Sequence, residues 1–217
     1  MLQQVLFKKF TIFYLAVAIL YFLALFFLPQ YVSVTKPLIM SSLIGFYIST
    51  ETRQNNGFLL GMIFALLGDI FLMFDNDSFF IAGLFCFLLM QWTYLFTFKQ
   101  HFTKPNVKTA LYFTTIFLIS CSLLAWMWPY LGSMKMHVTI YFISILSMVF
   151  FAITRDKNIP FYFSVVSGAI LFLISDALLA VNKFALQFNY AGVLVMLTYI
   201  AAQYLIVTGI VGQRYHK

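Results

Sequence analysis

The sequence predicts an all-α integral membrane protein that crosses the bilayer eight times. Its 217 residues are 63% hydrophobic and only 9% charged, and no soluble domain of this length buries so much apolar surface. Apolar runs alternate with short polar segments along the whole sequence, with no soluble domain between them. We therefore expect a single transmembrane domain over residues 1–217.

Each apolar run is bounded by polar residues, and each is predicted to be one membrane-spanning helix. We expect these helices at residues 10–28, 34–50, 57–74, 79–98, 108–126, 136–153, 160–181 and 190–212. The first run is long enough to span and no Ala-x-Ala cleavage site follows it, so we interpret it as a helix and not as a signal peptide. The clearest breaks are Pro29-Gln30, Asn55-Asn56-Gly57, Asp75-Asn76-Asp77-Ser78, Thr103-Lys104-Pro105-Asn106 and Arg155-Asp156-Lys157-Asn158.

Basic residues are distributed unequally between the two ends of these spans. With eight spans, one side receives ten of the 13 basic residues: Lys8, Lys9, Arg53, Lys99, Lys104, Lys108, Arg155, Lys157, Arg214 and Lys217. The other side receives three, which are Lys36, Lys135 and Lys183. The positive-inside rule therefore places both termini in the cytoplasm. This distribution explains the net charge of +7 by membrane topology, so we expect no nucleic-acid partner.

Two carboxylates lie inside the predicted spans at matching positions. Residues 61–69 and 168–176 share a pattern of Gly, six apolar residues, a small residue and Asp. Asp69 and Asp176 each lie five residues before the predicted outer end of a span. A carboxylate in hydrocarbon costs several kcal/mol unless it is paired, hydrated or protonated, so we predict that both line one polar cavity. The repeated pattern also suggests a parallel duplication of four spans plus four.

Further polar side chains share helical faces within the spans. Gln91 and Tyr94 are three residues apart, Tyr199 and Gln203 are four apart, and Tyr141 lies in the sixth run. Residues at these spacings are neighbours on one face of a helix. Each of these side chains could instead form a hydrogen bond that joins two helices, without a role in function. The same structural alternative applies to Asp69 and Asp176.

Three polar residues lie near the predicted outer side. Lys36 and Lys183 are at span ends, where lysines either extend toward lipid headgroups or bind a phosphate. Ser175 directly precedes one carboxylate and has a hydroxyl to donate. We expect all three residues to be close to the cavity.

Several familiar chemistries find no matching residues in the sequence. His101, His137 and His216 belong to no HExxH motif and have no neighbouring Cys or Asp ligand set. No Gly-x-Ser-x-Gly elbow, Walker glycine motif or Rossmann glycine motif is present. We therefore expect neither a metal ion nor another cofactor.

Taken in order, these residues resemble the YhhN family of membrane proteins, which includes the mammalian lysoplasmalogenases. The resemblance extends from about residue 30 to residue 210. Where this chain has Gln91, we expect His in many relatives. The matching elements are Lys36-Pro37, Gly68-Asp69, Gly83 with Gln91 and Tyr94, Tyr141 with Met148, Gly168 with Ser175-Asp176 and Lys183-Phe184, and Tyr199 with Gln203.

This resemblance implies hydrolysis of the vinyl ether bond of lysoplasmalogens, which yields a fatty aldehyde and a glycerophospho-alcohol. That chemistry needs a carboxylic acid and a base, and Asp69 and Asp176 are the only carboxyl groups within the predicted spans. The expected partners are a lysophospholipid substrate and membrane lipids. The implied substrate-binding residues are Lys36, Gln91, Tyr94, Tyr141, Ser175, Lys183, Tyr199 and Gln203.

Two other functions would use the same buried carboxylates. Internal repeats with acidic residues at one depth are also typical of proton-coupled transporters. A lipid-binding protein without chemistry is the second alternative, and it predicts that either Asp can become Asn without loss of function. For all three functions the expected location is a membrane, most simply the inner membrane of a bacterium.

Overall fold

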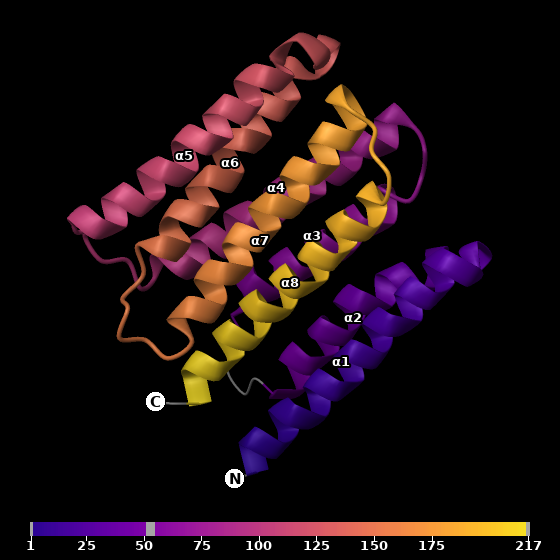
Figure 1. The fold of residues 1–217 in the computed structure, drawn as a ribbon. Helices are drawn as coiled ribbons and strands as arrows, with labels where there is room; N and C mark the ends of the chain where they lie inside the picture. The colour runs from indigo at the N-terminus through magenta and orange to yellow at the C-terminus, as the bar shows by residue number, and fades with distance from the viewer. Residues whose placement is uncertain (1, 51–54, 216–217) are drawn as a thin grey trace. The chain divides into compact units, whose positions relative to one another are not determined.

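The computed structural model describes residues 2–50 and 55–215, which form α-helices joined by short linkers (Figure 1). No β-strand forms in this part of the chain, and the predicted all-helical class is confirmed. Arg53, His216 and Lys217 lie outside the described residues. The helices are α1 (Leu2–Phe27), α2 (Val32–Thr50), α3 (Asn56–Phe71), α4 (Asp77–Lys99), α5 (Val107–Met127), α6 (Lys135–Ile153), α7 (Tyr162–Ala180) and α8 (Ala191–Tyr215).

Within residues 2–50 and 55–215, seven helical stretches are long and apolar enough to cross a membrane. They are Val5–Phe27, Pro29–Thr50, Asp77–Lys99, Val107–Tyr130, Gly132–Ile153, Tyr162–Ala185 and Ala191–Gln213. Helix α3 has 16 residues, about 24 Å at 1.5 Å per residue, against a hydrocarbon core of about 30 Å. A polytopic membrane protein is therefore established by the helices. The eighth span, the side of the termini and the duplication stay predictions.

The sequence predicted a third helix over residues 57–74, whereas α3 ends at Phe71. The reason is a turn directly after Phe71, in which the N–H of Met73 donates a hydrogen bond to the carbonyl of Ile70 at 3.1 Å. The N–H of Phe74 bonds to the carbonyl of Phe71 in the same way, at 3.2 Å. Such bonds to the third preceding residue close a turn and do not continue an α-helix.

Asparagines begin three of the helices at the polar breaks seen in the sequence. The Asn55 side chain accepts from the N–H of Phe58 at the start of α3, at 3.2 Å. Asn106 accepts from the N–H of Thr109 at the start of α5, at 2.9 Å. Asn76 accepts from the N–H of Ser78 at the start of α4. Each side chain satisfies a backbone donor that the first turn of a helix leaves without an acceptor.

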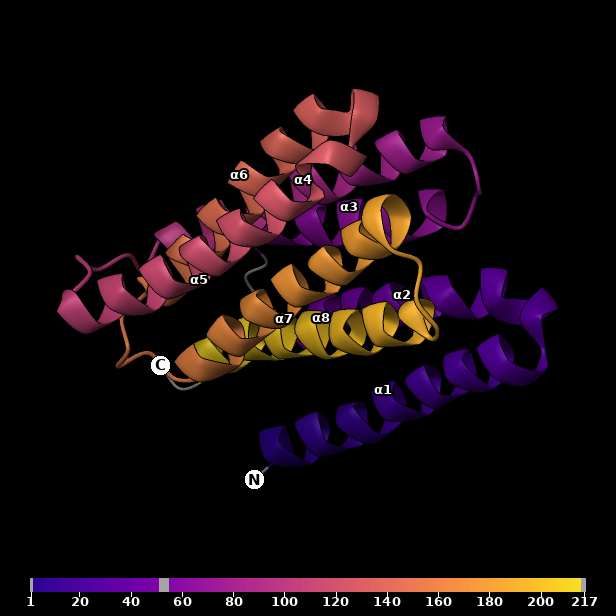
Figure 2. The ribbon, with the colours of Figure 1, turned by 45° about the horizontal axis from the view of Figure 1, so that its top comes forward.

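The chain forms two compact units, Met1–Met90 and Gln91–Lys217, with the boundary inside α4. In the first unit α1 and α2 form an antiparallel pair, visible in Figures 1 and 2, and α3 contacts α2. The Phe10 and Phe46 rings stack between α1 and α2, with centroids 3.8 Å apart. The Tyr47 hydroxyl accepts the N–H of Asn55 at 2.9 Å and so connects α2 to the start of α3.

In the second unit α7 and α8 are antiparallel and closely packed (Figures 1 and 2). Gly168 allows this approach, because a Cβ there would lie 2.7 Å from Cγ1 of Ile206 and 2.8 Å from the carbonyl oxygen of Ala202. Gly209 acts likewise from α8, where a Cβ would lie 2.7 Å from Cγ2 of Val165. Small residues at the interface are how helices without a hydrophobic driving force pack in a membrane.

Helix α5 shows the lipid-facing character of the fold. Only Thr109 and Met127 of this helix are buried, while Leu111 and Ile119 are about two-thirds exposed, at 67% and 65%. A soluble protein rarely exposes such a continuous apolar surface. Hydrocarbon covers it without cost, which agrees with a membrane location.

Candidate functional site

The Asp69 carboxylate lies in the first unit and is almost fully buried, with 3% of its surface exposed. Helix α2 brings Lys36 close enough for an electrostatic interaction with it, and α1 brings Tyr21 to the same carboxylate. A buried carboxylate beside an ammonium group is far less costly than an isolated one. The first unit therefore contains a polar cluster of Asp69, Lys36 and Tyr21.

Glycines fix the position of Asp69 at the end of α3. A Cβ at Gly68 would lie 2.8 Å from the Phe87 ring, and one at Gly83 would lie 2.8 Å from Leu72. The ends of α3 and α4 therefore approach closely through two glycines. Because α3 ends at Phe71, Asp69 lies two residues before the end of its helix, and the predicted separation of five residues is wrong.

Asp176 lies in the second unit, on α7, and is half-buried. The Tyr141 hydroxyl of α6 donates a hydrogen bond to Oδ2 of this carboxylate. Two residues that were selected separately from the sequence are therefore in direct contact. The hydrogen bond holds one carboxylate oxygen in place.

Two further residues selected from the sequence, Tyr94 and Gln203, meet between α4 and α8. The Tyr94 hydroxyl donates to Oε1 of Gln203 at 3.0 Å, and both side chains are fully buried. Tyr199 lies one turn before Gln203 and packs against Phe172 of α7, with ring centroids 6.1 Å apart. The contact explains why both helices have polar residues at helical spacing within apolar runs.

Several buried polar atoms in this unit have no hydrogen-bond partner among the described residues. Those near Tyr94 and Tyr141 are both amide atoms of Gln91, Nε2 of Gln203 and Oγ of Ser144. Gln91 approaches the Tyr141 hydroxyl, and Ser144 lies three residues after Tyr141 on α6. Buried polar groups are normally hydrogen-bonded. The interior around Tyr141 therefore offers donors and acceptors to a polar ligand or a water molecule.

The two remaining predicted residues have different surroundings. The Ser175 hydroxyl donates to the carbonyl of Val195 on α8 at 2.9 Å, so it joins the two helices. Lys183 is exposed and lies in a π-helical segment, Val181–Ala185, directly after α7. The substrate contacts predicted for these two residues stay predictions, and a contact by Ser175 would compete with the bond to Val195.

Sequence reasoning missed Tyr21 and Ser144. Tyr21 lies in the first apolar run among many other aromatics, since the chain has 28 Phe and 13 Tyr, and nothing in the sequence distinguishes it. Ser144 had a readable signal, because its spacing of three residues places it on the same helical face as Tyr141.

The cluster of the first unit offers a carboxyl, a phenol and an ammonium group, and that of the second unit offers carboxyl, phenol and amide groups. Within the described ranges, no group of three or more His, Cys, Asp or Glu side chains could hold a metal ion. Asp69 belongs to the first unit and Asp176 to the second. Their convergence on one cavity stays a prediction.

Comparison with known proteins agrees with the resemblance seen in the sequence. The family model of the YhhN family matches residues 3–210. The chain is 25% identical over 162 residues to the lysoplasmalogenase TMEM86A of Bos taurus, and the match covers 71% of this chain and 65% of that protein. The human TMEM86A lysoplasmalogenase is 24% identical over 161 residues, with the same two coverages of 71% and 65%.

A mycobacterial relative gives a shorter match of higher identity. The lysoplasmalogenase of Mycobacterium bovis is 33% identical over 92 residues, which are 42% of this chain and 34% of that protein. The chain thus matches slightly less than two-thirds of the length of its bovine and human relatives. No solved structure matches it significantly.

Proposed function

The chain belongs to the YhhN family, and we propose that it is a lysoplasmalogenase-like hydrolase of the membrane. Its substrate would be a lysophospholipid with a vinyl ether chain, and its products a fatty aldehyde and a glycerophospho-alcohol. Relatives named lysoplasmalogenase support this choice. The observation on which the proposal rests is the Asp176 carboxylate, held by Tyr141 in an interior where the Gln91 amide has no hydrogen-bond partner among the described residues.

The first step of the proposed reaction is protonation of carbon. A carboxylic acid transfers its proton to the β-carbon of the vinyl ether, and the π electrons form the new C–H bond. The α-carbon and the ether oxygen then share the positive charge as an oxocarbenium ion. The carboxylate left behind stabilises this cation electrostatically, and a positioned acid of this kind contributes about 10²–10⁴-fold to a rate.

The second step is capture of the cation by water. A water oxygen bonds to the α-carbon while a carboxylate accepts a proton from that water, giving a hemiacetal. The hemiacetal hydroxyl then gives its proton to the carboxylate that acted as the acid in the first step, and its oxygen forms the C=O bond of the aldehyde. The bond from the α-carbon to the glycerol oxygen breaks, and the glycerol oxygen takes the proton that the other carboxyl group accepted from water, so both groups return to their starting states. We propose Asp69 and Asp176 as the acid and the base, with either assignment of the two roles.

The neighbouring polar residues have supporting roles in this proposal. Gln91 and Ser144 have buried polar atoms without a partner in the part of the chain that the structure describes, and these atoms would hold the attacking water or a glycerol oxygen. Tyr94, Tyr199 and Gln203 would contact the polar part of the substrate from α4 and α8. Lys36 and Lys183 would bind the phosphate of the lysolipid, because an ammonium group is a point charge suited to that anion.

The direct test is aldehyde release by the purified protein in detergent. Lysoplasmenylethanolamine should yield aldehyde, whereas the acyl-ester lysolipid of the same chain length should not. Asp176→Asn should keep the protein folded and lower kcat at least about a hundredfold, because Asn cannot transfer the proton. Asp75→Asn is the matched control, since Asp75 is exposed and lies outside the proposed site.

Three outcomes would contradict the proposal. If the Asp176→Asn protein keeps near-normal turnover, the carboxylate is structural and the acid–base mechanism is wrong. If no aldehyde forms but a proton gradient drives lipid uptake into vesicles, the protein is a transporter. Binding of the lysolipid without turnover or transport would instead indicate a lipid-binding protein.

A further inference from the structure

The connection between α5 and α6 carries exposed aromatic side chains that have no part in the candidate site. Trp126, Trp128 and Tyr130 are about half exposed, at 48%, 44% and 53%. Met127 and Leu131 lie between and after them and are buried, at 3% and 2%. The buried residues fix this segment to the protein, so the three aromatic rings face outward. Trp126, Trp128 and Tyr130 are called the aromatic belt below.

The backbone of this connection places the aromatic belt at the tip of a helix pair. Two short 3₁₀ turns, Trp128–Tyr130 and Gly132–Met134, follow α5. Gly132 has a positive φ of 50°, a conformation that glycine adopts at little cost. The chain therefore reverses direction within a few residues, and α6 returns antiparallel to α5 (Figures 1 and 2).

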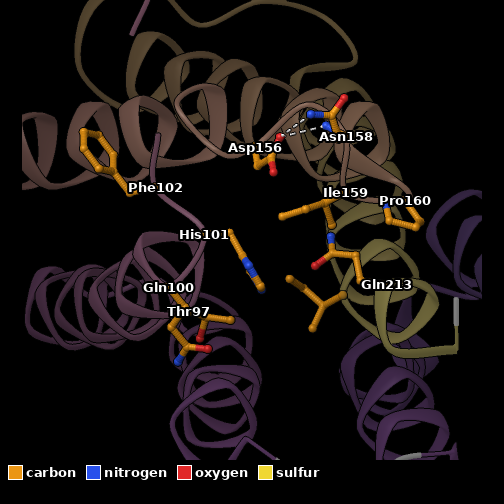
Figure 3. Close-up of a pocket in the computed structure, with 10 residues that line it drawn as sticks. Thr97, Gln100, His101, Phe102, Asp156, Asn158, Ile159, Pro160 and Gln213 are labelled. Carbon is orange, nitrogen blue, oxygen red and sulfur yellow. Dashed lines mark hydrogen bonds between the residues drawn. The ribbon is translucent and has the colours of Figure 1, made fainter. Parts of the chain in front are cut away.

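The opposite end of the second unit carries charged and polar side chains. A pocket at that end is lined by polar residues that include Gln100, His101, Asp156 and Asn158 (Figure 3). The cations exposed at that end include Lys99, Lys104, Lys108 and Lys157. Because a charged side chain is costly in hydrocarbon, this charged end lies at a boundary between membrane and water.

Arg155 belongs to the charged end but is buried, with only 1% of its surface exposed. The sequence indicated a surface charge at this position, and the structure corrects that interpretation. Its Nη2 donates to Oε1 of Gln213, and the guanidinium lies over the Phe98 ring, 5.5 Å from the centroid.

Helix α6 gives the distance between the charged end and the aromatic belt. It has 19 residues, Lys135–Ile153, and is therefore about 28–29 Å long at 1.5 Å per residue. The hydrocarbon core of a bilayer is about 30 Å thick. With the charged end at one boundary of the membrane, the aromatic belt lies at the other boundary.

A cation beside the aromatic belt supports the same depth. Nζ of Lys135 lies over the Trp128 ring, 5.3 Å from its centroid. An ammonium group is costly within hydrocarbon. The Trp128 ring is therefore close to a polar layer and not at the centre of the bilayer.

We propose that the aromatic belt binds the interfacial layer of the bilayer, where the glycerol and ester groups of lipids meet their acyl chains. Trp and Tyr suit this layer because their rings are apolar while the indole N–H and the phenol O–H need polar partners. The two indoles and the phenol would donate to lipid oxygens, and the rings would contact the first methylene groups.

This contact with lipid would set the depth of the second unit in the membrane. Helix α5 also contacts Val181–Ala185, the segment directly after α7. The aromatic belt would thus fix the depth of α7, on which Asp176 lies. The proposal is independent of the hydrolase activity, because it concerns lipids that are not consumed.

The test is depth-dependent quenching of tryptophan fluorescence in the full chain, reconstituted into phosphatidylcholine vesicles. The chain has three Trp residues, so Trp92→Phe leaves only the two of the aromatic belt. Lipid brominated near the top of its acyl chains should quench this variant about twofold more than lipid brominated near the chain ends. Vesicles without bromine give the reference intensity.

The matched control is a protein that keeps Trp92 and carries Trp126→Phe together with Trp128→Phe. Trp92 is 50% exposed and lies seven residues before Lys99, the last residue of α4, which is about 10 Å along the helix. The order of quenching by the two lipids should reverse in this protein. All three substitutions keep an aromatic ring, and the Trp92→Phe protein decides the proposal by itself.

Three results with the Trp92→Phe protein would overturn the proposal. Stronger quenching by bromine near the chain ends would place the aromatic belt deep in hydrocarbon. Quenching by iodide in the water but by neither lipid would place the rings outside the membrane. No quenching by any of these reagents would mean that protein, such as a second copy of the chain, covers the rings.

Discussion

The two acidic motifs of the chain are nearly identical in sequence and differ in their surroundings. Asp69 is 3% exposed and interacts electrostatically with an ammonium group, Lys36, and a phenol, Tyr21. Asp176 is half-buried and accepts a hydrogen bond from the phenol of Tyr141. A cation thus lies near the deeply buried carboxylate, while a hydroxyl group holds one oxygen of the more accessible one.

This difference shows what a sequence motif can specify. The pattern of Gly, apolar run, small residue and Asp sets where a carboxylate lies on its helix and how closely the next helix approaches. The partner of the carboxylate comes from helices elsewhere in the chain, such as α1 and α2 for Asp69 or α6 for Asp176. Two copies of one motif can therefore serve different chemical roles, and variants of equivalent residues should separate those roles.

The largest expected effect is that of removing both carboxyl groups. Asp69→Asn and Asp176→Asn should each lower kcat for the lysoplasmalogen at least about a hundredfold. If the two groups act in one reaction, the double variant should lose scarcely more activity than either single variant, because one missing partner already disables the other. The measurement is aldehyde release by all three proteins under saturating substrate.

The double variant also shows how the comparison could fail. Losses that multiply to about ten-thousandfold would mean that the carboxylates contribute independently. A normal rate in Asp69→Asn alone would make Asp69 a structural partner of Lys36 and leave Asp176 as the one catalytic carboxyl group. Melting curves of each variant should match the parent, so that a folding defect is not mistaken for lost chemistry.

The next effect in size concerns the two phenols. Tyr141→Phe should lower kcat about ten- to a hundredfold, because it removes a hydrogen bond to a carboxylate, which is typically worth about 1.5–3 kcal/mol. Tyr21→Phe should have a smaller effect, about two- to threefold, since Asp69 keeps the nearby ammonium group of Lys36. Equal losses in both variants would show that the two carboxylates depend on their phenols to the same extent. Tyr112→Phe is the control, because Tyr112 is 66% exposed on α5.

The fold could be predicted from the sequence because its signals are local. Apolar run length sets each helix, and Asn55 and Asn106 begin helices where the sequence placed polar breaks. The end of α3 could not be predicted, since residues 70–74 are apolar and would suit a helix, yet the chain turns there. Hydropathy reports the environment of a residue, whereas the turn depends on the local hydrogen bonds of the backbone.

Part of the candidate site could also be predicted, because its signals are local in the sequence. Asp176, Tyr141, Tyr94 and Gln203 are conspicuous because polar groups in an apolar run require partners, and the structure pairs them two by two. The buried state of Arg155 could not be predicted. A basic residue in a polar linker is typical of a membrane surface, and its burial depends on α8 and Phe98, which are remote in sequence.

Helix packing gives the third prediction, on stability. Gly168→Ala should destabilise the protein by about 1–3 kcal/mol, because the new Cβ would meet the backbone oxygen of Ala202 at 2.8 Å, and a backbone cannot rotate away. Gly68→Ala should cost less, since its Cβ would meet only the Phe87 ring, which can turn. Gly192→Ala, with nothing within 4 Å, is the control. Unfolding in increasing denaturant measures all three, and equal costs at Gly68 and Gly168 would contradict the distinction.

The smallest expected effects are those of the lysines, and they concern substrate binding. Lys183→Ala should raise KM about two- to fivefold with kcat unchanged, because an exposed charge contributes only about 0.2–1 kcal/mol to binding a phosphate. Lys36→Ala should raise KM similarly and should also lower kcat, since it removes the ammonium group beside Asp69.

Lys135→Ala is the control, because this lysine lies over the Trp128 ring, 5.3 Å from its centroid, and is outside the proposed site. The increase in KM should shrink as salt is added, since salt screens an exposed charge. An unchanged KM in both site variants would mean that the lysines extend to the lipid headgroups and do not bind the substrate.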